Sequence, residues 1–207
     1  SFSQENLYEF HEAVGGHPMS ISFLQQLVQN SSMLSIDIDE LRKRSVEASR
    51  DWLFTKVFNI LTEEEKETIL TLSIFDYPFA DKEIEILITT QIRPQFMMMP
   101  LLKKHFVYLV GDKYVIHDAI RTLAYSMIAS ARREQLHRIM ADHIYKKMEE
   151  QWNSDKNVEF ELGYPWSYHM ENLTNFNEKE RMIERLLTLD DVHLSALLSI
   201  VQRGYPY

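Results

Sequence analysis

The chain has 207 residues and is 45% hydrophobic, so it can bury a core of one or two domains and is not expected to be disordered. Its 22 Lys and Arg against 31 Asp and Glu give a formal charge of −9, which disfavours binding to nucleic-acid phosphates. The absence of cysteine excludes disulfides and thiolate metal sites. No apolar run approaches the roughly 20 residues that span a bilayer, and no secretory leader is visible. We therefore expect a cytoplasmic protein with no membrane partner.

Helical spacing of apolar residues predominates, and few glycines and prolines are present to form the turns of an all-β fold. The predicted fold class is therefore mainly α. We expect three parts: a helical subdomain over 1–61, a winged helix with one β-hairpin over 62–130, and an α-helical, repeat-like region over 131–207. The paired short helices near the C-terminus suggest the beginning of a solenoid.

The first part contains two helices separated by a glycine pair. Gly15 and Gly16 stop the first helix, and Pro18 stands where a first-turn proline is tolerated in the second. A polar loop follows over 30–37, and a long helical pattern runs from about residue 39 to 61.

The second part opens with the clearest helix start in the chain. Thr62 and Glu65 have the spacing of a capping box, and three acidic residues in the first turn suit the helix dipole. We therefore assign these carboxylates to helix capping rather than to acid–base catalysis. Asp81 is expected to cap the next helix. Met97, Met98 and Met99 lie in a third, interrupted helix and are expected to pack in the core rather than line a binding groove.

Two β-like runs joined by Gly111-Asp112 predict a hairpin, and three helices followed by a hairpin is the order of a winged helix. Asp118 is expected to cap the helix that follows. His117 is the last residue of the hairpin, beside a helix N-terminus that favours anions, and could donate a hydrogen bond to a phosphate there. The alternative is that His117 faces the core or the solvent.

We find no catalytic arrangement. The chain contains neither a GxxxxGK[ST] phosphate loop nor an HExxH motif. His137 and His143 lie six residues apart, and helix packing or solvation explains them better than a metal site. Acidic residues outnumber basic ones over 62–130, which favours a protein-contact module over a DNA reader.

Three blocks of the chain resemble, in order, segments of STAND signal-transduction ATPases, the class that includes NB-ARC, NACHT and MalT-like proteins. "LYEFHEAVGGHPMSISFLQQLV" is similar to the family's helical lid, and "LTEEEKETILTLSIFDYPF" to the opening of its winged helix. "YVIHDAIRTLAYSMI" resembles the closing MHD-type segment, with Ile116 in place of methionine and with Arg121 and Ala124 at the family's positions. With two further helical segments, the resemblance covers about residues 5–190.

The resemblance implies a lid, a winged helix and an early repeat region, without the P-loop core. Pro18 would pack near the adenine, and His117 would touch the β-phosphate of bound ADP. Gly15, Gly16 and Asp118 would have structural roles. ADP or ATP, with Mg²⁺ held by the missing core, would bind only in the longer protein, which would be an ATPase. The chain alone would be no enzyme and would hold no cofactor or metal.

The implied function is to couple the nucleotide state of the core to conformational change and protein assembly in signalling or transcription control. The implied partners are the chain's own P-loop core and proteins that bind the C-terminal helical region. Two alternatives stay open: a DNA-binding winged-helix regulator, which the charge balance disfavours, and a helical-repeat scaffold that binds proteins.

Overall fold

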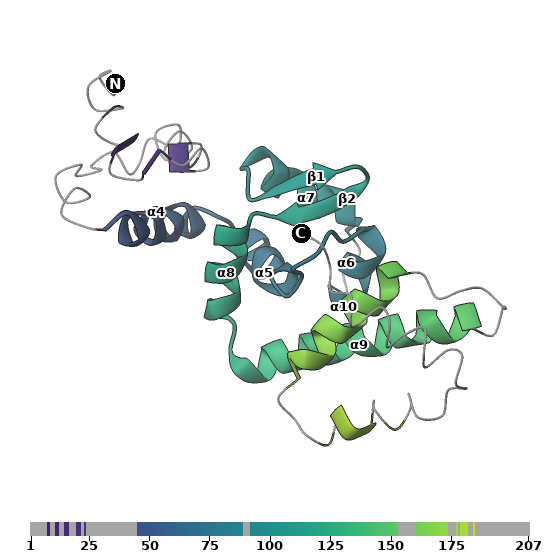
Figure 1. Cartoon of the computed structure of the whole chain (residues 1–207). Helices are drawn as coiled ribbons and strands as arrows, with labels where there is room; N and C mark the ends of the chain where they lie inside the picture. The colour runs from purple at the N-terminus through teal and green to yellow at the C-terminus, as the bar shows by residue number, and fades with distance from the viewer. Residues whose placement is uncertain are drawn as a thin grey trace. The chain divides into compact units, whose positions relative to one another are not determined.

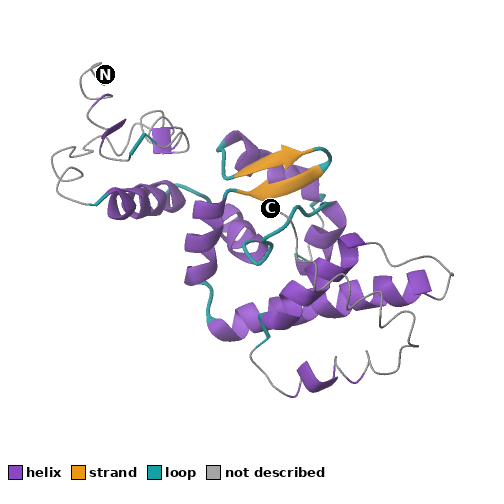
Figure 2. Ribbon diagram, in the orientation of Figure 1, coloured by secondary structure: helices purple, strands orange, loops and turns teal. Residues whose placement is uncertain are grey.

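The computed structural model describes three long segments, 45–88, 92–152 and 160–173, and a few single positions near both ends of the chain. The described elements are helices apart from one β-hairpin (Figures 1 and 2). Their bounds are α4 Val46–Asn59, α5 Glu63–Leu72, α6 Asp81–Leu87, α7 Pro94–Lys103, β1 Val107–Val110, β2 Lys113–Ile116, α8 Asp118–Met127, α9 Ser130–Trp152 and α10 Phe160–Glu171. The mainly α fold with one hairpin is confirmed. No described helix combines the length and the apolar character needed to cross a membrane.

The chain divides into two compact units. Unit 1 comprises Ser1–Pro78 and Thr90–Ala124, and unit 2 comprises Phe79–Thr89 and Tyr125–Tyr207. The boundaries predicted at 61 and 130 stay a prediction. The loop predicted over 30–37 and the part of the predicted repeat-like region after residue 184 lie outside the described residues.

In unit 1, an aromatic cluster joins the hairpin to the preceding helices. The Phe106 side chain, just before β1, is fully buried. Its ring centroid lies 5.1 Å from that of Phe23 and 6.3 Å from that of Phe54 on α4. Burial of three aromatic rings together is a large apolar contribution to this core.

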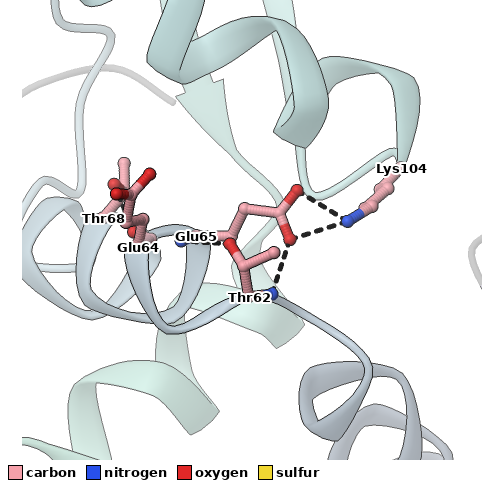
Figure 3. A network of polar contacts seen from close by, with 5 residues as sticks. All are labelled: Thr62, Glu64, Glu65, Thr68 and Lys104. Carbon is pink, nitrogen blue, oxygen red and sulfur yellow. Dashed lines mark hydrogen bonds and ion pairs between the residues drawn. The ribbon is translucent and has the colours of Figure 1, made fainter. Parts of the chain in front are cut away.

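The start of α5 confirms the predicted capping box and adds a partner. The Thr62 hydroxyl accepts from the Glu65 backbone N–H at 3.2 Å, and the Glu65 carboxylate accepts from the Thr62 backbone N–H at 2.8 Å. The same carboxylate also receives the Lys104 ammonium, at 2.6 and 2.7 Å, from the end of α7 (Figure 3). The Glu65 carboxylate therefore caps the start of α5 and also links α5 to α7, because both interactions use the same two oxygen atoms.

Glu65→Ala is expected to destabilise unit 1 by about 2 kcal/mol, since it removes both the cap and a half-buried ion pair. Glu65→Gln keeps a side chain that can accept from the Thr62 N–H and should cost about 1 kcal/mol. Urea unfolding of the two variants measures the difference. A Glu65→Gln variant as stable as the wild type would show that the charge of Glu65 contributes nothing, and equal losses in the two variants would show that the cap contributes nothing beyond the charge.

α7 ends in a Schellman motif, and His105 occupies the left-handed position that glycine usually takes. The Phe106 N–H donates to the Leu101 carbonyl at 3.0 Å, and the His105 N–H donates to the Leu102 carbonyl at 3.1 Å, with a φ of 56° at His105. The methionines of α7 do not share one environment: Met98 is fully buried, whereas Met99 is 47% exposed. The prediction that this run packs in the core therefore holds for Met98 and is wrong for Met99.

The hairpin has the predicted antiparallel pairing, with Val107 opposite Ile116 and Val110 opposite Lys113. Gly111 turns the chain at a φ of 64°, a conformation that favours glycine. β2 alternates buried and less buried residues, as a strand covering a core does. β1 instead exposes three consecutive apolar side chains after Val107, namely Tyr108, Leu109 and Val110.

In unit 2, α6 packs against α9, and α9 packs against α10. Asp81 does not cap α6 as predicted: Ala80 is the N-cap residue, and Asp81 is the first residue inside the helix. The reason is that Glu83 reaches back, so that its carboxylate accepts from the Ala80 N–H at 3.0 Å. The Glu83 carboxylate also receives the Lys147 ammonium of α9 at 2.9 Å. Burial alone would raise the pKa of Glu83, but Lys147 and the Ala80 N–H lower it below its usual value.

Candidate functional site

The predicted site centres on the junction between β2 and α8. The His117 backbone N–H donates to the Phe106 carbonyl at 3.4 Å, which continues the hairpin ladder by one residue. Ile116, before it, is buried, and Phe106 is anchored in the aromatic cluster. The hairpin therefore fixes the backbone of His117, while its side chain is partly exposed at the surface of unit 1.

α8 begins at this histidine. The His117 carbonyl accepts from the Arg121 backbone N–H at 2.9 Å, which is the first hydrogen bond of the helix. Asp118 is thus the first residue inside α8 rather than its N-cap, so that α8 begins one residue earlier than predicted. Its exposed carboxylate lies in the first turn, where a negative charge interacts favourably with the helix dipole.

This junction is suited to an anion. The first backbone N–H groups of α8 have no partner within the helix, and the helix dipole is positive at that end. Arg121 adds a cation one turn along α8, and its Nε atom is buried without a hydrogen-bond partner among the described residues. Arg121 is not among the predicted site residues, although its spacing of four residues from His117 places both on one face of the helix start. The site's own negative charge is Asp118, which is exposed.

The glycine pair of the predicted lid is a Schellman motif. The Gly16 N–H donates to the His11 carbonyl at 2.8 Å, and the Gly15 N–H donates to the Glu12 carbonyl at 3.1 Å. Both glycines have positive φ, 63° and 66°, and a Cβ on Gly16 would lie 2.8 Å from the His11 ring. The prediction that this pair stops a helix is confirmed. Pro18 lies outside the described residues, so its relation to His117 stays a prediction.

A second polar cluster, in unit 2, was not predicted. His137 of α9 and His169 of α10 are both fully buried, and their Nδ1 atoms lie 2.8 Å apart. His137 Nε2 lies 3.0 Å from the hydroxyl of Tyr125, which donates to Asn172 Oδ1 at 3.2 Å. The Asn172 side-chain amide donates to the Tyr168 carbonyl at 2.9 Å, near the end of α10. No local sequence signal marks this cluster, because its two histidines are far apart in the chain.

Burial shifts the ionisation of these histidines. Burial and the nearby charge of Arg133 lower the pKa of His137 from 6.5 to about 4. Burial, and then the neighbouring His137, hold the pKa of His169 well below its usual value. His143, which was predicted to be solvated or to pack against another helix, is partly exposed, and burial followed by the charge of Lys147 lowers its pKa. Within the described part of the chain, no group of three His, Cys, Asp or Glu side chains could hold a metal ion.

Comparison with known proteins supports a fold assignment. Neither the scan against models of protein families nor the search of curated proteins found a match. The structure is similar to that of a STAND protein with a tetratricopeptide repeat sensor from Pyrococcus horikoshii, with a TM-score of 0.66 and 18% sequence identity. The similarity covers 98% of this chain but only 27% of the solved one. The chain therefore has the fold of a segment of a STAND protein.

Proposed function

We propose that the chain is the regulatory segment of a STAND-type ATPase, containing its lid, its winged helix and the start of a helical-repeat region. In this role it couples the ADP or ATP state of a P-loop core, located elsewhere in a longer protein, to conformational change and protein assembly. The observation that supports this most is the fold similarity to a STAND protein over 98% of the chain. The order α5, α6, α7, β1, β2, α8, which is that of a winged helix, agrees with it.

His117 is the proposed nucleotide contact. Its imidazole stands beside the N-terminus of α8, so it donates a hydrogen bond to a phosphate oxygen there, and Arg121 adds positive charge one turn away. The nucleotide supplies the phosphate charge, and the core holds its Mg²⁺. Only an interaction that differs between ADP and ATP can shift a conformational equilibrium. One charge-assisted hydrogen bond, at about 1.5–3 kcal/mol, shifts it by roughly ten- to a hundredfold.

His117→Ala in the longer protein is expected to speed ADP release by roughly ten- to a hundredfold, because it removes this bond. Stopped-flow release of a fluorescent ADP analogue measures the rate. His105→Asn is the matched control: His105 is an exposed histidine of the same unit, and asparagine tolerates its left-handed backbone. ADP release that is the same in the His117 and His105 variants would remove His117 from the proposed contact.

The P-loop core gives a direct test of the whole proposal. A GxxxxGK[ST] phrase and an acidic Walker-B strand in the reading frame before this segment would support it. Their absence would refute it, because a site formed between core and lid cannot be completed by this chain.

A DNA-binding winged helix is the second candidate, and α7 would be its reading helix. Two exposed side chains on α7, Phe96 at 64% and Met99 at 47%, are apolar. Lys104, at its end, is paired with Glu65. α7 and its N-cap also expose two cations, Lys103 and Arg93, but the apolar side chains favour a protein partner over a phosphate backbone. A mobility shift with duplex DNA at moderate salt would reverse this preference.

A protein-binding scaffold is the third candidate, supported by the packing of α9 against α10 as a helix pair. It predicts that residues 150–207 capture a protein partner without the winged helix. The regulatory proposal predicts instead that partner binding depends on the nucleotide state of the core.

A further inference from the structure

The buried cluster of unit 2 has no part in the proposed nucleotide contact. His137 and His169, which we call the imidazole pair, come from α9 and α10 and have no solvent exposure. Tyr125 and Asn172 continue the same chain of hydrogen bonds. Buried polar groups of this kind are costly unless every donor and acceptor is matched.

The protons of this cluster can be assigned from its geometry. The Asn172 amide donates through Nδ2 to the Tyr168 carbonyl, so its Oδ1 faces Tyr125 and accepts the hydroxyl proton. The Tyr125 oxygen must then accept from His137 Nε2, so a neutral His137 has a bare Nδ1. His169 Nδ1 therefore carries the proton that is shared across the 2.8 Å contact. In the neutral state each of these contacts has one proton.

An added proton disturbs this arrangement. Placed on His137 Nδ1, it would set two N–H groups against each other across the 2.8 Å contact. Placed on the far nitrogen of His169, it keeps the contact but makes a cation with no solvent exposure.

The surroundings of the pair also oppose the added charge. Arg133 is the cation that acts on His137, and its guanidinium carbon lies 4.9 Å from the ring centroid of Tyr125. The rings of Tyr125 and Tyr168 lie at 70° and 66° to the His137 ring, with centroid distances of 5.8 and 5.7 Å. Tyr168 makes the same kind of contact with His169 at 5.2 Å.

We propose that the imidazole pair is a proton-sensitive latch: neutral rings hold α10 against α9, and uptake of one proton by the pair loosens α10. The separated rings reach water, where the charge is solvated. The latch uses no residue of the β2–α8 junction. A test of the latch can therefore fail without affecting the proposed nucleotide contact, and the reverse is also true.

Hydrogen exchange of the α10 backbone amides, divided by the intrinsic exchange rate at each pH, tests the latch in the 207-residue chain. From the shift of His137 alone, protection of α10 is expected to fall by about twentyfold between pH 7 and pH 5. In the double variant His137→Leu/His169→Leu, two apolar side chains of similar volume replace the pair. Protection should then lose most of its pH response over this range, since nothing at the contact titrates and only the smaller contribution of His143 remains.

The control variant is His143→Gln, which removes another α9 histidine and leaves the pair intact; its α10 protection should keep most of the pH response. Nitrogen-15 spectra of the wild-type imidazoles give a second measurement that needs no variant. They should show the Nε2–H tautomer for His137 and the Nδ1–H tautomer for His169 at pH 7. Wild-type protection that does not change between pH 7 and pH 5, or a double variant that responds as the wild type does, would overturn the latch.

Discussion

Phe106→Ala is expected to destabilise unit 1 by about 3–5 kcal/mol, more than any substitution at the surface of the same unit. The ring is fully buried between Phe23 and Phe54, so its removal leaves a cavity and ends two aromatic contacts. The substitution is expected to disturb the candidate site as well, because the Phe106 carbonyl accepts a hydrogen bond from the His117 N–H. Urea unfolding followed by far-ultraviolet circular dichroism measures the loss.

The chain provides a matched control for this substitution in Phe96, which is 64% exposed. Phe96→Ala should change stability by no more than about 0.5 kcal/mol, as surface substitutions usually do. Phe106→Leu, which keeps most of the volume, should cost about 1.5 kcal/mol. A Phe106→Ala variant as stable as Phe96→Ala would mean that the aromatic cluster is not the anchor of the hairpin.

Acidification from pH 7 to pH 5 is expected to lower the stability of unit 2 by about 2 kcal/mol through His137 alone. In the unfolded chain this histidine titrates near 6.5, and in the folded chain its pKa is about 4. Between these values the unfolded state binds more protons, so stability falls as the pH falls. Above the unfolded pKa both states are neutral, and the effect disappears. The denaturant midpoint at a series of pH values measures it.

Two other groups of unit 2, His143 and Glu83, also lower its stability as the pH falls, and their contributions can be measured separately. The lowered pKa of His143 acts in the same pH range, so His143→Gln subtracts its contribution. Glu83, whose pKa is lowered below 4.5, stabilises the fold at higher pH and loses that contribution only as the pH falls through its folded value. A stability profile that is flat between pH 7 and pH 5 would contradict the assignment of neutral, buried rings.

The features that could be predicted from the sequence are local ones. The Thr62–Glu65 box depends on four consecutive residues, and the hairpin turn depends on Gly111 with its positive φ. Helix starts were less certain, because Ala80 and His117 take the N-cap positions assigned to the aspartates that follow them. Moving the helix start by one residue changes the free energy little, since each aspartate still lies in the first turn, where its negative charge is favourable.

The features that could not be predicted are contacts between distant residues. The partner of Glu65 is Lys104, 39 residues away, and the partner of His137 is His169, 32 residues away. No spacing rule connects such pairs, because their approach is decided by how whole helices pack. The exposure of Met99 could not be predicted for the same reason. Three adjacent methionines on a helix point in three directions, and only the packing of α7 determines which one is buried.

The capping box of α5 also determines how much the Glu65–Lys104 pair can contribute. An ion pair near the surface normally gains little, since two long side chains must both be held in one conformation. Here the bond to the Thr62 N–H restricts the Glu65 side chain without any contribution from Lys104. Only the lysine then loses rotamer freedom, up to about 2 kcal/mol, when α7 docks. The α5 cap thus preorganises a binding point for α7, and a local turn of helix lowers the entropic cost of a long-range contact.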